Sequence, residues 1–96
     1  MQTVLEDFVT TLAPKVRGTI KGTAKLVIKD HGAVMLSEDG ATATDGDADV
    51  TLKASEKTFR AILDGSQNPI MAVMSGKLKV DGNQMRALKV SDILTA

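Results

Sequence analysis

The sequence predicts an α+β fold, in which helices pack on one face of a five-stranded, mostly antiparallel sheet. Apolar residues recur at helical spacing near both ends of the chain and in two segments after residue 55. The segments between them alternate apolar and polar residues, with the period of two that is typical of strands with one buried side. Because 96 residues leave room for one core, we expect a single domain over residues 1–96.

The first helix is expected over residues 3–16. Thr3 can cap its N-terminus, with Glu6 three residues later as in a capping box, and Pro14 should end or kink it. One face of this helix is apolar: Val4, Leu5, Phe8, Val9 and Leu12.

Three strands are expected next, as an antiparallel meander. The first covers residues 17–29, and short turns separate it from strands over 33–37 and 41–44. A fourth strand begins at Ala48, where the alternation resumes. The apolar face of the first strand is Ile20, Ala24, Leu26 and Ile28.

Two helices follow the fourth strand. Ser55 caps a helix that runs to residue 64, with Gly65 as its C-terminal stop. Asn68 and Pro69 begin a short helix that is apolar nearly all round, which indicates that it is buried or lines something apolar.

A fifth strand and a last helix complete the predicted order. The strand covers residues 77–81, with Leu78 and Val80 facing inward. The last helix covers residues 83–94. We therefore expect the order helix, four strands, two helices, strand, helix.

The composition excludes several classes of protein. Twelve basic side chains balance twelve acidic ones, so no long-range field attracts the protein to nucleic acid or to an anionic membrane. The chain has no cysteine, which is compatible with a reducing cytosol. No apolar run approaches the ~20 residues that cross a bilayer, and the N-terminus does not resemble a signal peptide. We expect a soluble cytoplasmic domain with no nucleic acid partner and no stable membrane insertion. Transient contact with membranes is compatible with this expectation.

One acidic stretch, DGDADVTLKASE over residues 45–56, places acids at positions 1, 3, 5 and 12, as a calcium-binding loop does. Such a loop also needs glycine at its sixth position, where Val50 stands, and helices on both sides. We therefore interpret the acids as a polar turn that leads into a strand, and expect no metal.

Catalytic motifs are absent from the sequence. The single histidine, His31, lies in a predicted turn, where a solvated residue is the simpler interpretation. No phosphate loop or hydrolase motif is present. We expect no catalytic residue and no cofactor. An enzyme that uses clustered acids is the third of three hypotheses, with Asp45, Asp47 and Glu56 as its candidates.

The second half of the chain resembles the sterol carrier protein family, the small sterol-binding and lipid-transfer domains. Three stretches carry the resemblance in order: DADVTLKASEKTF, ILDGSQNPIMAVMSGKLKVDGN and ALKVSDIL. They are similar to the family's strand and Ser-capped helix, its Asn-Pro segment with the strand that follows, and its closing helix. The chain is short for the family and lacks a C-terminal peroxisomal tripeptide, so it resembles a small stand-alone member of the bacterial type.

The resemblance implies an apolar tunnel between sheet and helices. It also implies non-enzymatic binding of fatty acids, fatty acyl-CoA, phospholipids or sterols, with transfer inside the cell as an extension. Carried onto this chain, the tunnel walls are Phe59, Ile62, Leu63, Ile70, Met71, Val73, Met74, Leu88, Ile93, Leu94, Leu26, Ile28 and Val50. Arg60, Lys77 and Lys79 are the candidates for a rim that meets a carboxylate or phosphate head group.

The same apolar residues are also expected of an ordinary filled core. The alternative is therefore a structural or dimerisation module of the same fold, which docks onto a partner enzyme. The sequence leaves both a monomer and a homodimer open.

Overall fold

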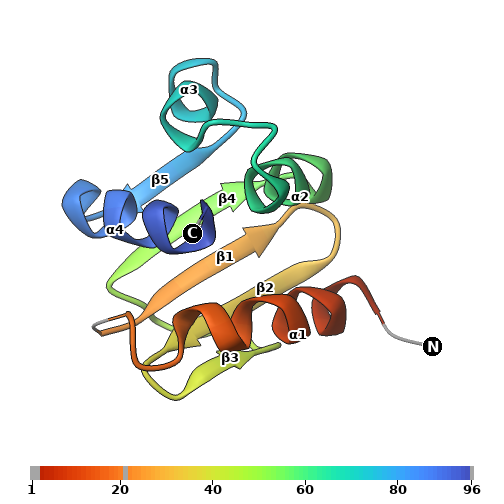
Figure 1. The fold of residues 1–96 in the computed structure, drawn as a ribbon, viewed down its shortest axis with the longest axis vertical. Coiled ribbons are helices and arrows are strands. Elements are labelled where there is room, and N and C mark those ends of the chain that lie inside the picture. The colour runs from red at the N-terminus through yellow and green to blue at the C-terminus, as the bar shows by residue number, and fades with distance from the viewer. Residues whose placement is uncertain (1–2, 21, 96) are drawn as a thin grey trace.

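Five strands form one sheet in the order β3-β2-β1-β4-β5. The computed structural model describes residues 3–20 and 22–95. The strands are β1 Ala24–Ile28, β2 Gly32–Ser37, β3 Gly40–Thr42, β4 Val50–Ala54 and β5 Lys79–Gly82. The helices are α1 Val4–Val16, α2 Glu56–Asp64, α3 Pro69–Met74 and α4 Gln84–Thr95. The predicted class and element order are confirmed (Figure 1).

The predicted meander forms the first half of the sheet, where β1, β2 and β3 pair antiparallel. The central strand β1 then pairs with β4 in parallel, so that Leu26 lies between Val34 of β2 and Leu52 of β4. The edge strand β5 returns antiparallel to β4, with Val80 opposite Leu52. One parallel pair among antiparallel ones gives the mostly antiparallel sheet that the sequence predicts.

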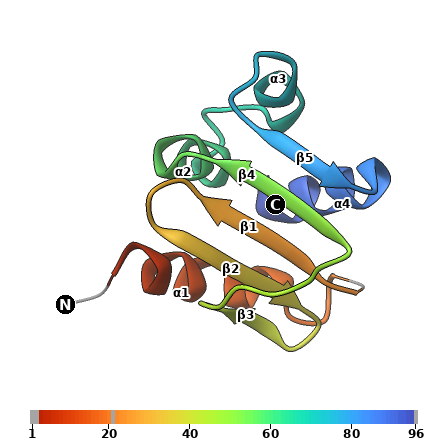
Figure 2. The ribbon, with the colours of Figure 1, turned by 180° about the vertical axis from the view of Figure 1, so that it is seen from behind.

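The helices cover one face of the sheet, and the opposite face carries none in the view from behind (Figures 1 and 2). α1 packs on β2 and β3, and α4 packs on β4 and β5. The covered face receives alternate residues of the central strands: Ala24, Leu26, Ile28, Val50, Leu52 and Ala54. α3 lies apart from this layer, beside β5 and at the end of the molecule opposite α1 (Figures 1 and 2).

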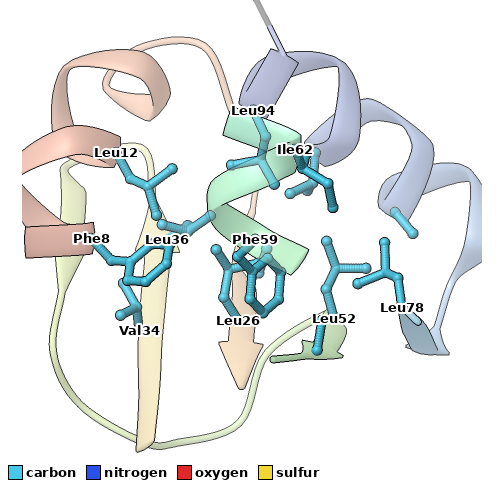
Figure 3. Close-up of a cluster of buried hydrophobic side chains, with 14 of the residues drawn as sticks. Phe8, Leu12, Leu26, Val34, Leu36, Leu52, Phe59, Ile62, Leu78 and Leu94 are labelled. Carbon is cyan, nitrogen blue, oxygen red and sulfur yellow. The ribbon is translucent and has the colours of Figure 1, made fainter. Parts of the chain in front are cut away.

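The core lies between the sheet and helices α1, α2 and α4 (Figure 3). Phe8 and Phe59 are the only aromatic residues of the chain, and they contact each other edge to face with ring centroids 6.2 Å apart. Both rings are buried. Aliphatic side chains complete the packing around this pair, among them Leu12, Leu26, Leu36, Leu52, Ile62 and Leu94.

The first strand is shorter than predicted, because β1 begins at Ala24 rather than at residue 17. Gly18 and Gly22 adopt positive φ angles of 73° and 76°, which turn the chain away from an extended path. Ile20 is still buried, although it belongs to the connection between α1 and β1.

Further boundaries also differ from the prediction. β5 begins at Lys79, since the backbone N–H groups of Lys77 and Leu78 both donate to Ala72 O and so close the end of α3. The end of α1 at Val16 is as predicted, although Pro14 lies inside the helix and does not end it. Residues 43–49 form an irregular loop, and β4 begins at Val50.

Candidate functional site

α3 is a helix whose apolar side chains are mostly in contact with solvent. Asn68 caps it, with Oδ1 accepting hydrogen bonds from the N–H groups of Ile70 (2.8 Å) and Met71 (3.2 Å). Its exposed side chains are Ile70 (55%), Met71 (58%), Val73 (44%) and Met74 (77%). Only Ala72 of this helix is fully buried, so α3 is joined to the core by one small side chain.

A groove of about 180 Å³ lies between α3, β5 and α4. No charged side chain is among its lining residues, which are Pro69, Ile70, Val73, Met74, Val80, Gln84, Ala87, Leu88 and Ser91. Leu88 is 49% exposed and forms the rim contributed by α4. The groove therefore offers an almost wholly apolar surface.

Small side chains on α4 leave space for the groove. Ala87 and Ser91 lie one helical turn apart, and both line it. The Ser91 hydroxyl donates a hydrogen bond of 2.9 Å to Ala87 O, which satisfies this polar group within its own helix. The side chains of α4 at these two positions are thus small, and the Ser91 hydroxyl needs no hydrogen-bond partner from a ligand.

A second hollow, of about 340 Å³, lies on the other flank of α4. Its lining is more polar: Thr19, Ile20, Thr23, Val50, Asn83, Met85, Arg86, Lys89, Val90 and Ile93. Arg86 Nη1 lies 3.7 Å from Asp49 Oδ2, and the same carboxylate oxygen accepts a hydrogen bond of 3.1 Å from Thr23 N. This carboxylate ties the starts of β1 and β4 to α4.

The predicted tunnel residues divide into three groups. One group is packed into the core: Leu26, Ile28, Val50, Phe59, Ile62 and Leu94. Leu63 and Ile93 are partly buried against that core. The exposed group is Ile70, Met71, Val73, Met74 and Leu88, of which all but Met71 line the groove. The groove thus gathers four exposed members of the predicted set, and two others, Val50 and Ile93, line the second hollow.

The three candidate rim cations lie in different places. Arg60 is engaged on α2, where Nη1 lies 2.7 Å from Asp7 Oδ2 and Nε lies 2.7 Å from Glu56 Oε2, and it does not line the groove. Lys77 and Lys79 are exposed on either side of the buried Leu78, with Lys77 before β5 and Lys79 as its first residue. Neither lysine is among the lining residues of the groove.

The acids of residues 45–56 are distributed over separate interactions. Asp45 pairs with Lys25 at 3.0 Å, and the hydrogen bond from that ammonium group lowers the pKa of Asp45 below its ordinary 3.8. Glu56 accepts from Arg60 and also lies 3.3 Å from His31 Nε2, so the histidine in the turn has a carboxylate neighbour. Among residues 3–20 and 22–95, no three His, Cys, Asp or Glu side chains group as a metal site.

Sequence reasoning missed five residues of the groove: Pro69, Val80, Gln84, Ala87 and Ser91. Residues 84, 87, 88 and 91 are spaced three or four apart, so helical periodicity could have placed them on one face with Leu88. Val80 was predicted to face inward, and it does so at the partly buried floor of the groove. The sizes and polarities of these five residues are those of ordinary helices and strands, so they carry no signal of a groove.

A family model matches almost the whole chain, and two known proteins match about half of it. The model of the SCP-2 sterol transfer family matches residues 4–95. The fatty acid-binding protein of Yarrowia lipolytica is 40% identical over 55 residues, which are 57% of this chain and 43% of that protein. Hydroxysteroid dehydrogenase-like protein 2 of Rattus norvegicus is 40% identical over 48 residues, which are 50% of this chain and 9% of that protein. The chain therefore spans less than half the length of either relative.

The fold has a solved counterpart in sterol carrier protein 2 from Aedes aegypti in complex with palmitate. The TM-score is 0.78 at 17% identity, and the match covers 98% of this chain and 96% of that one. A likeness at this identity shows the fold alone. In the part of the chain that the structure describes, no helix has the length and apolar character to cross a bilayer.

Proposed function

The chain belongs to the SCP-2 sterol transfer family, and from that premise we propose that it binds a lipid of the fatty acid class, without catalysis. The proposed site is the groove between α3, β5 and α4. The observation that carries the proposal is the lining of this groove, which has no charged side chain and is built from exposed apolar residues of two helices.

An acyl tail suits this lining because it needs no directed bonds. Each buried methylene group contributes about 0.8 kcal/mol, so affinity grows with the length of tail covered. Two relatives support the ligand class: one is named a fatty acid-binding protein, and the Aedes aegypti structure holds palmitate. Transfer of the bound lipid between membranes is the further step of this proposal.

The groove holds only part of such a tail in its present form. Its 180 Å³ equals the volume of roughly six water molecules at about 30 Å³ each, and usual ligand sites occupy about 300–1,000 Å³. We infer that α3 moves outward when a long tail enters. α3 is suited to this because Ala72 is its only buried side chain, and Met74 can adjust to tails of different shape.

We expect the head group near Lys77 and Lys79, which follow α3 closely in the chain although neither lines the groove. Both side chains are exposed, and an ammonium group there can donate to a carboxylate or phosphate without leaving water. Such a contact orients the ligand but contributes little affinity, since exposed ion pairs are worth at most about 1 kcal/mol.

Charge placed in the groove tests the proposal. Val73→Asp should weaken binding of a fluorescent fatty acid at least tenfold, because a carboxylate would face the tail in the groove. Met85→Asp is the matched control, since Met85 is 70% exposed on α4 and does not line the groove. Thermal unfolding would check that both variants fold. Equal affinity in the two variants, or no uptake by the unmodified protein, would refute the proposed site.

A structural module is the second candidate, favoured by one observation. Several residues of the predicted tunnel are packed into the core, among them Phe59, Ile62 and Leu94. Native mass spectrometry separates the two candidates. Lipid that co-purifies with the protein supports the carrier, whereas a dimer that takes up no added fatty acid supports the module.

A further inference from the structure

We propose that α3 and the adjoining rim of α4 dock on the surface of an anionic lipid bilayer, so that the groove opens directly onto the membrane. The docking surface consists of Ile70, Met71, Val73, Met74 and Leu88. The inference rests on the proposed function, because it names the surface through which the same groove would exchange its lipid.

The docking surface is apolar and uncharged over a continuous stretch of chain. Residues 65–76 contain no charged side chain, and this stretch includes all of α3. Four of the six α3 residues are large, apolar and 44–77% exposed. A contiguous apolar patch of this kind on a protein surface marks a site of interaction.

The shape of this region fits a fluid interface. α3 projects beside the edge strand β5, at the end of the molecule opposite α1 (Figures 1 and 2). Its unbranched Met71 and Met74 side chains can enter the boundary between head groups and acyl chains, as the apolar side of an interfacial helix does.

Lysines beside the docking surface complement an anionic bilayer. Lys77 and Lys79 lie three and five residues after the end of α3, and both are exposed. Residues 65–80 contain these two lysines and no acidic side chain. The whole chain is neutral, so the attraction is local and acts within the Debye length of about 8 Å.

The groove is continuous with the docking surface. Ile70, Val73, Met74 and Leu88 line the groove and are also members of the surface. An acyl tail that passes between bilayer and groove would therefore leave one apolar environment and enter the next without crossing water. This continuity is the reason that we assign the surface to a bilayer rather than to a second copy of the chain.

Sedimentation with vesicles tests the docking surface. The unmodified protein should sediment with vesicles of phosphatidylcholine and phosphatidylserine (70:30) and much less with pure phosphatidylcholine. Met74→Ser should weaken this binding about tenfold, whereas Met85→Ser, which alters an equally exposed methionine on the other flank of α4, should leave it unchanged. Lys77→Gln and Lys79→Gln should each weaken binding to the anionic vesicles about fivefold. This factor corresponds to the contribution of about 1 kcal/mol from a lysine near such a surface. Lys15→Gln on α1, at the opposite end of the molecule, is the matched control for charge.

Three outcomes would overturn the docking surface. They are no sedimentation with anionic vesicles, an equal effect of Met74→Ser and Met85→Ser, and a homodimer in analytical ultracentrifugation that Met74→Ser dissociates. Fatty acid uptake measured without vesicles keeps this test separate from the proposed function. Uptake without vesicle binding removes the docking surface alone, and vesicle binding without uptake removes the carrier function alone.

Discussion

The guanidinium carbon of Arg60 lies 5.0 Å from the centroid of the Phe8 ring, so that a side chain of α2 covers an aromatic residue of α1. The same guanidinium contacts Asp7 on α1 and Glu56 on α2, each at 2.7 Å. These contacts join α2 to α1, in addition to the contact of Phe8 with Phe59. They engage the guanidinium of Arg60 within the protein, away from the groove.

Removing Arg60 should destabilise the fold moderately. Arg60→Ala should lower the free energy of unfolding by about 1–3 kcal/mol, since an exposed cation–π contact is worth about 0.5–1 kcal/mol and each of two exposed ion pairs about 0.2–1 kcal/mol. Urea denaturation measures the difference. Lys57→Ala on the same helix serves as control, and an equal loss in both variants would mean that the contacts of Arg60 contribute nothing.

Core and groove substitutions should separate stability from binding. Ile62→Ala should lower the free energy of unfolding by about 2–5 kcal/mol, because Ile62 is fully buried and truncation leaves a cavity. Val73→Ala should change it by less than about 0.5 kcal/mol, because its side chain is 44% exposed. Only the second variant should bind a fluorescent fatty acid more weakly at temperatures where both are folded. A loss of stability in Val73→Ala equal to that in Ile62→Ala would show that α3 belongs to the core.

The cap of α3 should control how readily this helix opens. Asn68→Ala removes the acceptor of the Ile70 and Met71 N–H groups, and loss of such a cap costs about 1 kcal/mol. Amide hydrogen exchange at these two residues should become faster, while exchange in α2 stays the same. Asn68→Asp, which keeps a side-chain oxygen at the cap, should restore most of the protection. Unchanged exchange in Asn68→Ala would mean that α3 does not depend on its cap.

Two glycines should respond differently to alanine. Gly65 and Gly82 both have positive φ, of 87° and 102°, which costs a residue with a Cβ about 1–2 kcal/mol. A Cβ at Gly65 would meet nothing within 4 Å, whereas one at Gly82 would lie 2.8 Å from Asp49 O. Gly82→Ala should therefore lower the midpoint of thermal unfolding more than Gly65→Ala does. Equal unfolding midpoints in the two variants would show that β4 and β5 accommodate the added methyl group without loss of stability.

The pair of Asp45 and Lys25 should appear in acid titration. The pKa of Asp45 is lowered in the folded protein by the hydrogen bond from Lys25, so the folded state favours the carboxylate. This contribution is present above the ordinary pKa of 3.8 and is lost as the pH falls through the lower value of the folded state.

NMR titration measures that value directly. Lys25→Gln should return the pKa of Asp45 toward 3.8. Asp64, whose pKa is lowered by its hydrogen bond with Ser66, is an internal control and should not change. A low pKa of Asp45 that persists in Lys25→Gln would assign the effect to the backbone of the loop instead.

Local signals in the sequence were sufficient for the helix starts. The predicted caps Thr3, Ser55 and Asn68 each accept a hydrogen bond from an N–H group of the first turn. The sequence did not show how far the first strand extends. Alternation from residue 17 predicted a strand, but the positive φ angles of Gly18 and Gly22 turn that segment into a connection.

The candidate site was predicted less completely than the fold. Periodicity identified the apolar faces of α2, α3 and α4 but treated Ile62 and Ile70 alike. In the structure the Ile62 side chain is fully buried in the core, whereas Ile70 is 55% exposed and lines the groove. The partners of Arg60 were also beyond the sequence, since Asp7 and Arg60 lie more than fifty positions apart.

The sequence by itself determined the order of the elements, their caps and the face that each turns toward apolar surroundings, because these depend on residues within a few positions of each other. Only the tertiary structure decided that β1 pairs in parallel with β4 and that α3 stands beside the sheet instead of over it. The physical reason is that a side chain is buried by what lies opposite it, and the opposite element comes from a distant part of the chain.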